Sequence, residues 1–306
     1  MYHSRRRVLT VADAIGAVTQ PPANTLAQTR VPASHQATAC AGVERQLLSV
    51  RSADGTVLAA EAKGDPAAPE ILFIHGLRQS RLSWDKQFSD PALAGFRMVR
   101  FDLRGHGDSD KPNALESYSD ADRWADDVAA VIAATKSRRP ILVGWSLGGY
   151  VAGAYLRKHG GSGIAGVNLA DAVTKLAPDL FTPLTNDFSR TTTSHEFSER
   201  VAATPDFLAA CFHQPPTGIE FQRMLVVNGM TPRAAYDGFL ITSTTDLEAV
   251  FAGYDGPILL THGAHDRLVR HAMAQRIRSL KPGSRLSVFA ESGHSPFLRG
   301  AETLWA

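Results

Sequence analysis

The chain alternates short strand-like runs with segments that have helical character. The strand-like runs are residues 71–74, 98–101, 141–144, 164–169, 256–261 and 285–289. Between Ser119 and Lys136 apolar residues recur at helical spacing, and residues 80–88, 150–159 and 271–280 also favour helices. Runs that are apolar on both faces are typical of central strands in a parallel sheet. The pattern therefore predicts an α/β fold with a doubly wound, mostly parallel sheet.

The first strands are expected to form a hairpin. Leu47–Val50 and Val57–Ala62 are strand-like, and the turn between them contains the pair Asp54-Gly55. An Asp-Gly pair between two strand-like runs is a strong signal for a tight β-turn. We therefore expect an antiparallel hairpin at the start of the packed domain.

The strand–helix alternation stops between Thr174 and Tyr254. This stretch carries scattered phenylalanines and favours short helices and loops. We expect residues 174–254 to form a helical lid, inserted between a first core part at 43–173 and a second at 255–306. Because the lid interrupts the sheet, it is expected to lie above the carboxyl ends of the strands.

Composition excludes several classes of protein. The 306 residues are 44% hydrophobic and 20% charged, with a formal net charge of +2. This balance is that of an ordinary globular domain and gives no reason to expect a nucleic-acid partner or an anionic membrane. No apolar run approaches the roughly 18 residues of a membrane span. The two cysteines, Cys40 and Cys211, provide neither a disulfide framework nor metal-type spacing. Composition does not predict the oligomeric state.

Residues 1–42 are expected to be a leader outside the fold, either disordered or an export signal. The stretch Ser4 to Leu9 contains three consecutive arginines and resembles a twin-arginine signal. Ala37-Thr-Ala39 before Cys40 fits an A-x-A cleavage site. Asp13 interrupts the apolar stretch and argues against export. We therefore expect a cytoplasmic location, with export to the periplasm or medium as the alternative.

The segment Gly144-Trp-Ser146-Leu-Gly148 is the first candidate for chemistry. It matches G-x-S-x-G and stands between an apolar strand and a helix-forming run. In that context the serine occupies a sharp, strained turn, with its hydroxyl exposed at the top of a sheet. Ser146 is therefore the candidate nucleophile.

A serine nucleophile needs a base, and the base needs an orienting acid. Asp266 and His294 follow later strand ends, in the chain order Ser, Asp, His. Because parallel strands end at one edge of a sheet, these groups can converge there. His294 is expected to be the general base and Asp266 its partner. Asp171, at the end of the strand 164–169, is the alternative acid.

An oxyanion hole is the third requirement, and backbone N–H groups usually provide it. One is expected from Leu147, directly after the nucleophile. The other is expected from Leu77, in the loop that follows His75-Gly76.

With these residues in view, the chain from Val43 to Leu304 resembles the serine α/β-hydrolases, most closely the branch of cofactor-free haloperoxidases (perhydrolases) and small carboxylesterases. The matching motifs also include the segments 102–109, 230–237, 263–266 and 292–297. The resemblance implies an α/β-hydrolase fold and no metal or organic cofactor. The family also has a helix after the His294 loop, and we expect this helix to be cut short at residue 306.

The remaining candidates are interpreted as structural. We expect His75 and His106 to pack their loops, and His262 and His265 to be solvated or to pack the acid loop rather than bind metal. Asp102 and Arg104 are expected to form an ion pair with each other. Two tryptophans, Trp84 and Trp145, are within possible reach of the substrate pocket.

The sequence thus predicts a serine hydrolase that cleaves a small, hydrophobic carboxylic ester through a Ser-His-Asp triad and an acyl-enzyme. Perhydrolase, lactonase and carbon–carbon bond hydrolase activities remain open within the same fold, because they differ in details of the pocket that the motifs do not include. A non-catalytic ligand receptor of this fold is the remote alternative.

Overall fold

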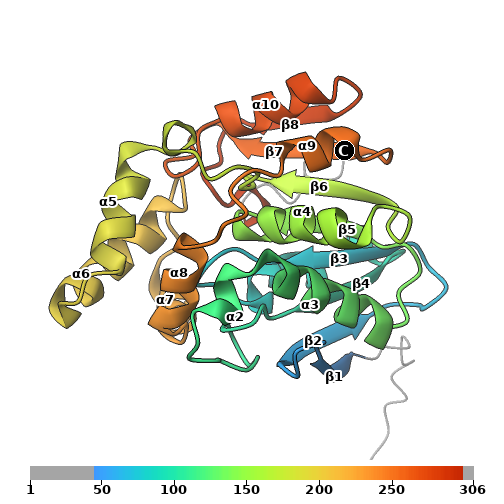
Figure 1. The fold of residues 1–306 in the computed structure, drawn as a ribbon, viewed down its shortest axis with the longest axis horizontal. Helices are drawn as coiled ribbons and strands as arrows, with labels where there is room; N and C mark the ends of the chain where they lie inside the picture. The colour runs from blue at the N-terminus through green and yellow to red at the C-terminus, as the bar shows by residue number, and fades with distance from the viewer. Residues whose placement is uncertain (1–44, 299–306) are drawn as a thin grey trace, which may run out of the picture. The chain divides into compact units, whose positions relative to one another are not determined.

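The computed structural model describes residues 45–298, which are built around one eight-stranded sheet (Figure 1). The strand order is β1-β2-β4-β3-β5-β6-β7-β8, and the bounds are Gln46–Arg51, Val57–Lys63, Glu70–Ile74, Arg97–Phe101, Ile141–Trp145, Gly166–Ala170, Ile258–Gly263 and Arg285–Phe289 for β1 to β8. Strands β1 and β2 pair antiparallel, as do β2 and β4. All pairs from β4 to β8 are parallel. The predicted hairpin and the mostly parallel sheet are both confirmed.

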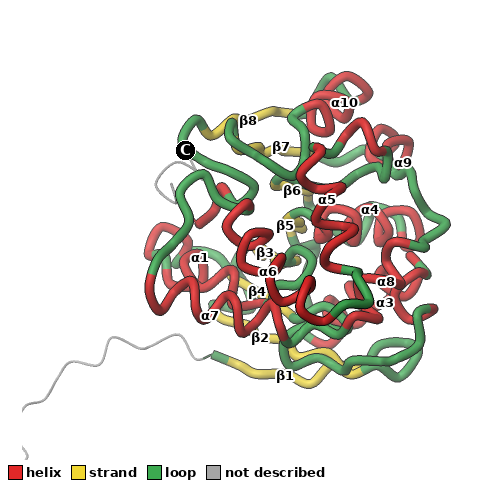
Figure 2. The backbone as a smooth tube through the Cα atoms, turned by 90° about the vertical axis from the view of Figure 1, so that its left-hand side faces the viewer, coloured by secondary structure: helices red, strands yellow, loops and turns green. Residues whose placement is uncertain are grey.

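Helices cover both faces of this sheet. On one face lie α3 (Ala121–Ala134), α4 (Leu147–His159), α9 (Glu248–Gly253) and α10 (Ala272–Leu280). The other face carries the short helices η2 (Arg81–Trp84) and α1 (Asp85–Ser89) (Figure 2). Within the sheet the side chains alternate between two buried apolar clusters: Leu72 and Ile74 of β3 pack with the α3 and α4 layer, whereas Ile71 and Phe73 pack with Trp84 and Phe88. This alternation follows from the period of two along a strand.

A long insertion separates β6 from β7. It contains η4 (Pro178–Leu180), α5 (Pro183–Thr192), α6 (Phe197–Ala210), α7 (Gly218–Gly229), α8 (Arg233–Leu240) and α9. Helices α5 to α8 lie beyond the carboxyl ends of the parallel strands, and Figure 2 shows α5 and α6 in front of those ends. Helix α9 instead packs against α4 and α10. The division of the core from a lid at residues 174 and 254 stays a prediction.

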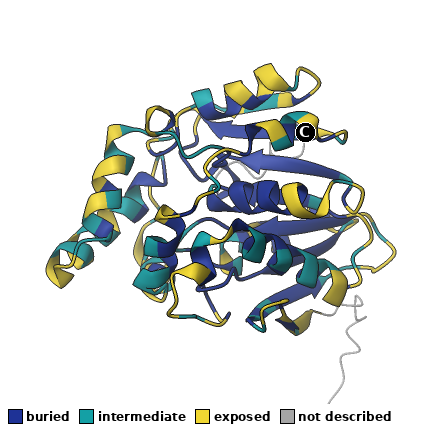
Figure 3. Cartoon of the chain, viewed as in Figure 1, coloured by how far each residue is buried: buried dark blue, intermediate teal, exposed yellow. Residues whose placement is uncertain are grey.

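Much of the outer surface of α5, α6 and α7 is exposed (Figure 3). Phe197 and Ile219 are each 71% exposed, whereas all but three residues of α4 are buried. In the part of the chain that the structure describes, no helix has the length and apolar character needed to cross a membrane. The short remaining helices are η3 (Pro91–Leu93), α2 (Glu116–Ser119) and η5 (Pro296–Leu298). The predicted leader and the shortened final helix lie outside the described residues.

Candidate active site

Ser146 occupies the turn between β5 and α4. Its backbone has φ 53° and ψ −115°, in the region that side-chain-bearing residues rarely adopt. Such a conformation costs on the order of 1–3 kcal/mol and persists only when its surroundings hold it. Here the Ser146 N–H donates to the Ala170 carbonyl at 3.0 Å, and the Ser146 carbonyl accepts from the Val173 N–H at 2.9 Å. The end of β6 therefore holds the strained turn.

Two glycines allow close approach around Ser146. A Cβ on Gly148 would lie 2.2 Å from the Ile74 carbonyl oxygen, so only glycine lets α4 begin against the end of β3. A Cβ on Gly76 would lie 3.2 Å from the Cβ of Ser146. The loop after β3 therefore passes directly over the serine.

His294 and Asp266 meet at the same edge of the sheet. His294 Nδ1 and Asp266 Oδ2 are 2.8 Å apart, with both side chains almost fully buried. Asp266 Oδ1 accepts the N–H groups of Leu268 at 2.8 Å and Val269 at 3.0 Å. Burial alone would raise the pKa of Asp266, but the His294 imidazole and its hydrogen bond outweigh burial and lower it. Asp266 is thus an ionised carboxylate that is hydrogen-bonded to His294.

The loop of His294 is anchored from the face opposite α3 and α4. Trp145 Nε1 donates to the His294 carbonyl at 2.6 Å, and the Trp145 ring packs edge-on against Phe297 with centroids 4.9 Å apart. Gln87 Nε2 donates to the Phe297 carbonyl at 2.7 Å. These contacts fix the backbone from which the imidazole projects.

Asp171, the alternative acid, interacts with Asp266, whereas the hydrogen bond of His294 Nδ1 goes to Asp266. Asp171 is fully buried with φ 42°, and its Oδ1 accepts the Gly263 N–H at 2.9 Å. Burial, followed by the negative charge of Asp266, raises the pKa of Asp171 well above its usual range. The protonated, neutral form of Asp171 is therefore favoured next to the ionised Asp266.

His262 lies between these two carboxyl groups. Its Nδ1 is 3.6 Å from Asp171 Oδ1 and its Nε2 is 3.7 Å from Asp266 Oδ2. The three residues form the one cluster of metal-ligand type in the described chain, with candidate ligand atoms within 4.8 Å of one another. The Asp266 oxygens already accept hydrogen bonds, which favours an acid network over a metal site. Burial lowers the pKa of His262 to about 4, so the ring is neutral. It is buried rather than solvated. His265 packs its loop as expected, stacked on His213.

The two leucines expected at the oxyanion hole, Leu77 and Leu147, both line the cavity next to Ser146. The loop of Leu77 is held by buried histidines. His75 Nε2 accepts the Leu103 N–H at 3.0 Å, and His106 Nε2 accepts the Arg78 N–H at 3.1 Å. Burial lowers the pKa of His75 to about 4 and that of His106 to about 3, so both rings are neutral acceptors. The expected structural roles of His75 and His106 are confirmed.

The predicted ion pair between Asp102 and Arg104 is wrong. Arg104 forms a buried bidentate pair with Asp127 of α3, at 2.7 Å for both contacts, and a further pair with Asp54. Asp102 instead pairs with Arg81 of η2. Because the chain turns sharply after β4, the two side chains point to different neighbouring elements, and each finds its partner there.

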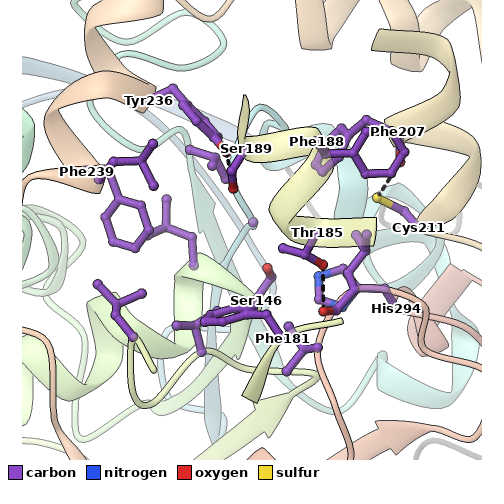
Figure 4. Close-up of a pocket in the computed structure, with 18 of the residues that line it drawn as sticks. Ser146, Phe181, Thr185, Phe188, Ser189, Phe207, Cys211, Tyr236, Phe239 and His294 are labelled. Carbon is purple, nitrogen blue, oxygen red and sulfur yellow. Dashed lines mark hydrogen bonds between the residues drawn. The ribbon is translucent and has the colours of Figure 1, made fainter. Parts of the chain in front are cut away.

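A cavity of about 250 Å³ opens above Ser146 and His294 (Figure 4). Its wall is mainly apolar: the aromatic members are Trp145, Phe181, Phe188, Phe207, Tyr236 and Phe239, and the aliphatic members include Leu77, Leu147, Val173, Leu176, Leu268 and Val269. Trp145 thus reaches the cavity. Trp84 does not line it and packs under Phe297 with ring centroids 4.2 Å apart.

The insertion contributes polar groups that the motifs gave no reason to select. Thr185 Oγ1 donates to the Leu268 carbonyl at 2.7 Å, and Tyr236 Oη donates to Ser189 Oγ at 3.0 Å (Figure 4). Cys211 also lines the cavity, but burial raises the pKa of its thiol, so it is no competing nucleophile. The one available signal was that Tyr236 belongs to the segment 230–237 of the haloperoxidase resemblance.

Comparison with known proteins agrees with this architecture. A family model described as the alpha/beta hydrolase fold matches residues 69–301. A bifunctional esterase/perhydrolase of Acinetobacter calcoaceticus is 30% identical, over 72% of this chain and 82% of its own length. A non-heme haloperoxidase of Rhodococcus erythropolis is 29% identical, over 83% of this chain and 95% of its own length.

Solved structures give the same picture. A Burkholderia cenocepacia protein assigned as an aryl esterase superposes with a TM-score of 0.80 and 38% identity, covering 84% of this chain and 94% of its own. The expected resemblance to the haloperoxidase and carboxylesterase branch is confirmed, as is the expected fold.

Proposed function

The chain belongs to the α/β-hydrolase family and is a hydrolase, and from this premise we propose that it cleaves carboxylic esters with Ser146 as nucleophile, His294 as general base and Asp266 as the orienting acid. The observation that carries the proposal is the 2.8 Å hydrogen bond between His294 and Asp266. His294 also lines the same cavity as Ser146. Esterase and perhydrolase are also the activities in the names of its relatives.

The mechanism follows from the chemistry of these groups. The serine hydroxyl attacks the ester carbonyl as His294 takes its proton, and the tetrahedral intermediate collapses to an acyl-enzyme when His294 returns that proton to the leaving alcohol. Water, deprotonated by His294, then releases the carboxylic acid. Asp266 keeps a proton on Nδ1, so Nε2 is the basic nitrogen, and it stabilises the imidazolium that forms.

The N–H groups of Leu77 and Leu147 would bind the developing oxyanion. Their position at the cavity wall and the close pass of Gly76 over Ser146 support this role. Removing one such donor typically costs on the order of 100-fold in rate or more. The apolar wall favours hydrophobic acyl and alkyl groups, and the cavity of about 250 Å³ favours small to medium ones.

Turnover of p-nitrophenyl acetate and butyrate tests the proposal. Ser146→Ala is expected to lower kcat by about 10³-fold or more, because the acyl-enzyme cannot form. Ser198→Ala, at an exposed position of α6, serves as the matched control and should keep wild-type turnover. Mass spectrometry after labelling with a fluorophosphonate should find the adduct on Ser146. Equal turnover by wild type and Ser146→Ala, or an adduct on another residue, would refute the assignment.

Perhydrolysis is the second candidate, favoured by the relatives named esterase/perhydrolase and haloperoxidase. The same acyl-enzyme would form from a carboxylic acid with loss of water, and hydrogen peroxide would then attack it to give the peracid. Peracid formation from acetate and peroxide, absent in Ser146→Ala, is the expected result. Ester turnover without peracid would leave the esterase proposal and remove this one.

A further inference from the structure

A second cavity, of about 190 Å³, adjoins the one above Ser146, and Tyr236 lines both. The insertion provides most of its wall, through residues of α5, α6, α7, α8 and the turn before α8. Arg78, from the loop after β3, completes the wall. Arg78 directly follows Leu77 in the chain, so the second cavity begins one residue from the candidate oxyanion hole.

The charge of this second cavity is positive. Its lining includes Arg78, Arg200 and Arg233 and no aspartate or glutamate. Arg233 is neutralised by Asp237, at 2.8 Å. Arg78 and Arg200 form no ion pair with any carboxylate among residues 45–298. Since guanidinium groups stay protonated in proteins, two positive charges face the cavity without a counterion from the described chain.

Hydrogen-bond donors in the same wall also lack partners. Arg78 Nη2 donates to Thr204 Oγ1 at 3.2 Å, but its Nη1 is buried without a partner within the described residues. The Thr231 hydroxyl is likewise buried and unpartnered there. A buried, unpaired donor on a charged group is costly. An anion in the cavity would accept from both groups and neutralise the charge.

The position of the cavity indicates which part of an ester would reach it. The general acid must contact the leaving oxygen, so the alcohol lies on the His294 side of Ser146. Figure 4 shows Tyr236 and His294 on different sides of Ser146. Tyr236 therefore borders the acyl side, and the arginine-lined cavity lies beyond the acyl group.

We propose that this second cavity is an anion subsite that binds a carboxylate at the far end of the acyl chain, which makes half-esters of dicarboxylic acids the preferred substrates. The inference rests on the proposed esterase function for its choice of substrate. The anion site itself rests on Arg78, Arg200 and the unpartnered donors. Arg78 Nη1 and the Thr231 hydroxyl are the donors that the carboxylate would engage.

The substrate test compares p-nitrophenyl half-esters of dicarboxylic acids of four to eight carbons with neutral p-nitrophenyl esters of equal acyl length, after correction for spontaneous hydrolysis. For at least one length, kcat/KM is expected to be about tenfold higher for the anionic ester, the size of one charged hydrogen-bonded contact. Arg78→Met and Arg200→Met should each lower this anionic-to-neutral ratio about tenfold.

Arg223→Met is the matched control, because Arg223 lies on the insertion with a 67% exposed side chain and does not line the second cavity. It removes the same charge and should leave the ratio unchanged. A wild-type ratio at or below one for every length would overturn the proposal. An equal fall in Arg223→Met would also overturn it, since the preference would then arise from long-range attraction.

Calorimetry separates this inference from the esterase proposal. Glutarate and inorganic phosphate are titrated into Ser146→Ala, with and without Arg78→Met. Glutarate binding that Arg78→Met weakens about tenfold supports the subsite even if no ester is turned over, a result that would overturn only the esterase proposal. Turnover of neutral esters without glutarate binding would overturn the subsite alone. Binding of phosphate without any half-ester preference would identify a free anion as the ligand and overturn the substrate assignment.

Discussion

At the scale of single residues, the site contains two buried carboxyl groups, Asp171 and Asp266, and His294 Nδ1 is hydrogen-bonded to Asp266. Asp266 accepts the His294 Nδ1 hydrogen bond and two backbone N–H groups, which stabilise its ionised form. Asp171 has one backbone donor and no contact with His294 among its hydrogen bonds. Ionising two adjacent buried carboxyl groups together is unfavourable, so the carboxyl group that accepts more hydrogen bonds carries the negative charge. This physical difference favours Asp266 over Asp171 for the proposed orienting role.

We expect Asp266→Asn to lower kcat/KM by about 10³–10⁴-fold, because the amide cannot stabilise the imidazolium and favours the wrong tautomer. Asp171→Asn should lower it less than about tenfold, because asparagine is a neutral isostere of a protonated aspartic acid. Steady-state kinetics with p-nitrophenyl butyrate measures both. A severe loss in Asp171→Asn with a mild one in Asp266→Asn would move the acid role to Asp171.

Residue identity and position in the chain were enough to predict that Ser146, Asp266 and His294 lie close together, because strand ends of a parallel sheet converge at one edge. They were not enough to pair Asp102 and Arg104. Which carboxylate a buried arginine meets depends on helix packing, here on α3 with its Asp127. The same limit applies to Arg78, whose neighbours come from the insertion.

At the scale of elements, the insertion provides much of the wall of the cavity above Ser146. Tyr236 of α8 lines both cavities, of about 250 and 190 Å³, and donates a hydrogen bond to Ser189 of α5 at 3.0 Å. A bulky ring at the border of two cavities narrows the passage that an acyl chain must take. Its removal should therefore widen the passage between them.

Tyr236→Ala is accordingly expected to shift the optimum acyl length of neutral p-nitrophenyl esters upward by several carbons, measured as kcat/KM from acetate to dodecanoate. Tyr236→Phe, which keeps the ring volume and removes only the hydrogen bond to Ser189, is the matched control and should keep the wild-type optimum. An unchanged optimum acyl length in Tyr236→Ala would contradict the prediction that this ring narrows the passage between the two cavities.

The order of elements was predictable from the sequence, whereas the arrangement of the insertion was not. Strands such as β3 are continuous apolar runs bounded by turn residues, because both of their faces are buried. Helices α5 to α8 are partly exposed; α6 contacts α5 and α7, whereas α8 packs chiefly against α2. Their geometry is fixed by side-chain contacts such as that of Tyr236 with Ser189, for which sequence periodicity has no signal.

At the scale of the whole molecule, function and stability share the same buried histidines. His75 and His106 hold the loops around the candidate oxyanion hole, and His262 lies in the acid network, each as a neutral ring. Their folded pKa values, about 4, 3 and 4, lie below the ordinary value of 6.5. Protonation therefore favours the unfolded chain.

The sign of the pH dependence follows from this difference. Between pH 6.5 and 4 the unfolded chain binds more protons at these histidines, so each one costs up to about 1.4 kcal/mol of stability per pH unit as the pH falls. Asp171 acts in the opposite sense, because its raised pKa gives a contribution that is present at low pH and is lost as pH rises. Three histidines outweigh one aspartate, and we expect the free energy of unfolding to fall by on the order of 3 kcal/mol from pH 7 to pH 5.

Urea unfolding at both pH values measures this loss. His106→Gln, whose amide can still accept from the Arg78 N–H, should show a smaller loss than wild type, because one titrating ring is gone. An unfolding free energy that stays constant or rises from pH 7 to pH 5 would contradict the assignment of these rings as neutral in the folded protein. At pH 5 the rings of His75 and His106 are still neutral in the folded chain, so this loss of stability leaves the hydrogen bonds that hold the loop of Leu77 in place.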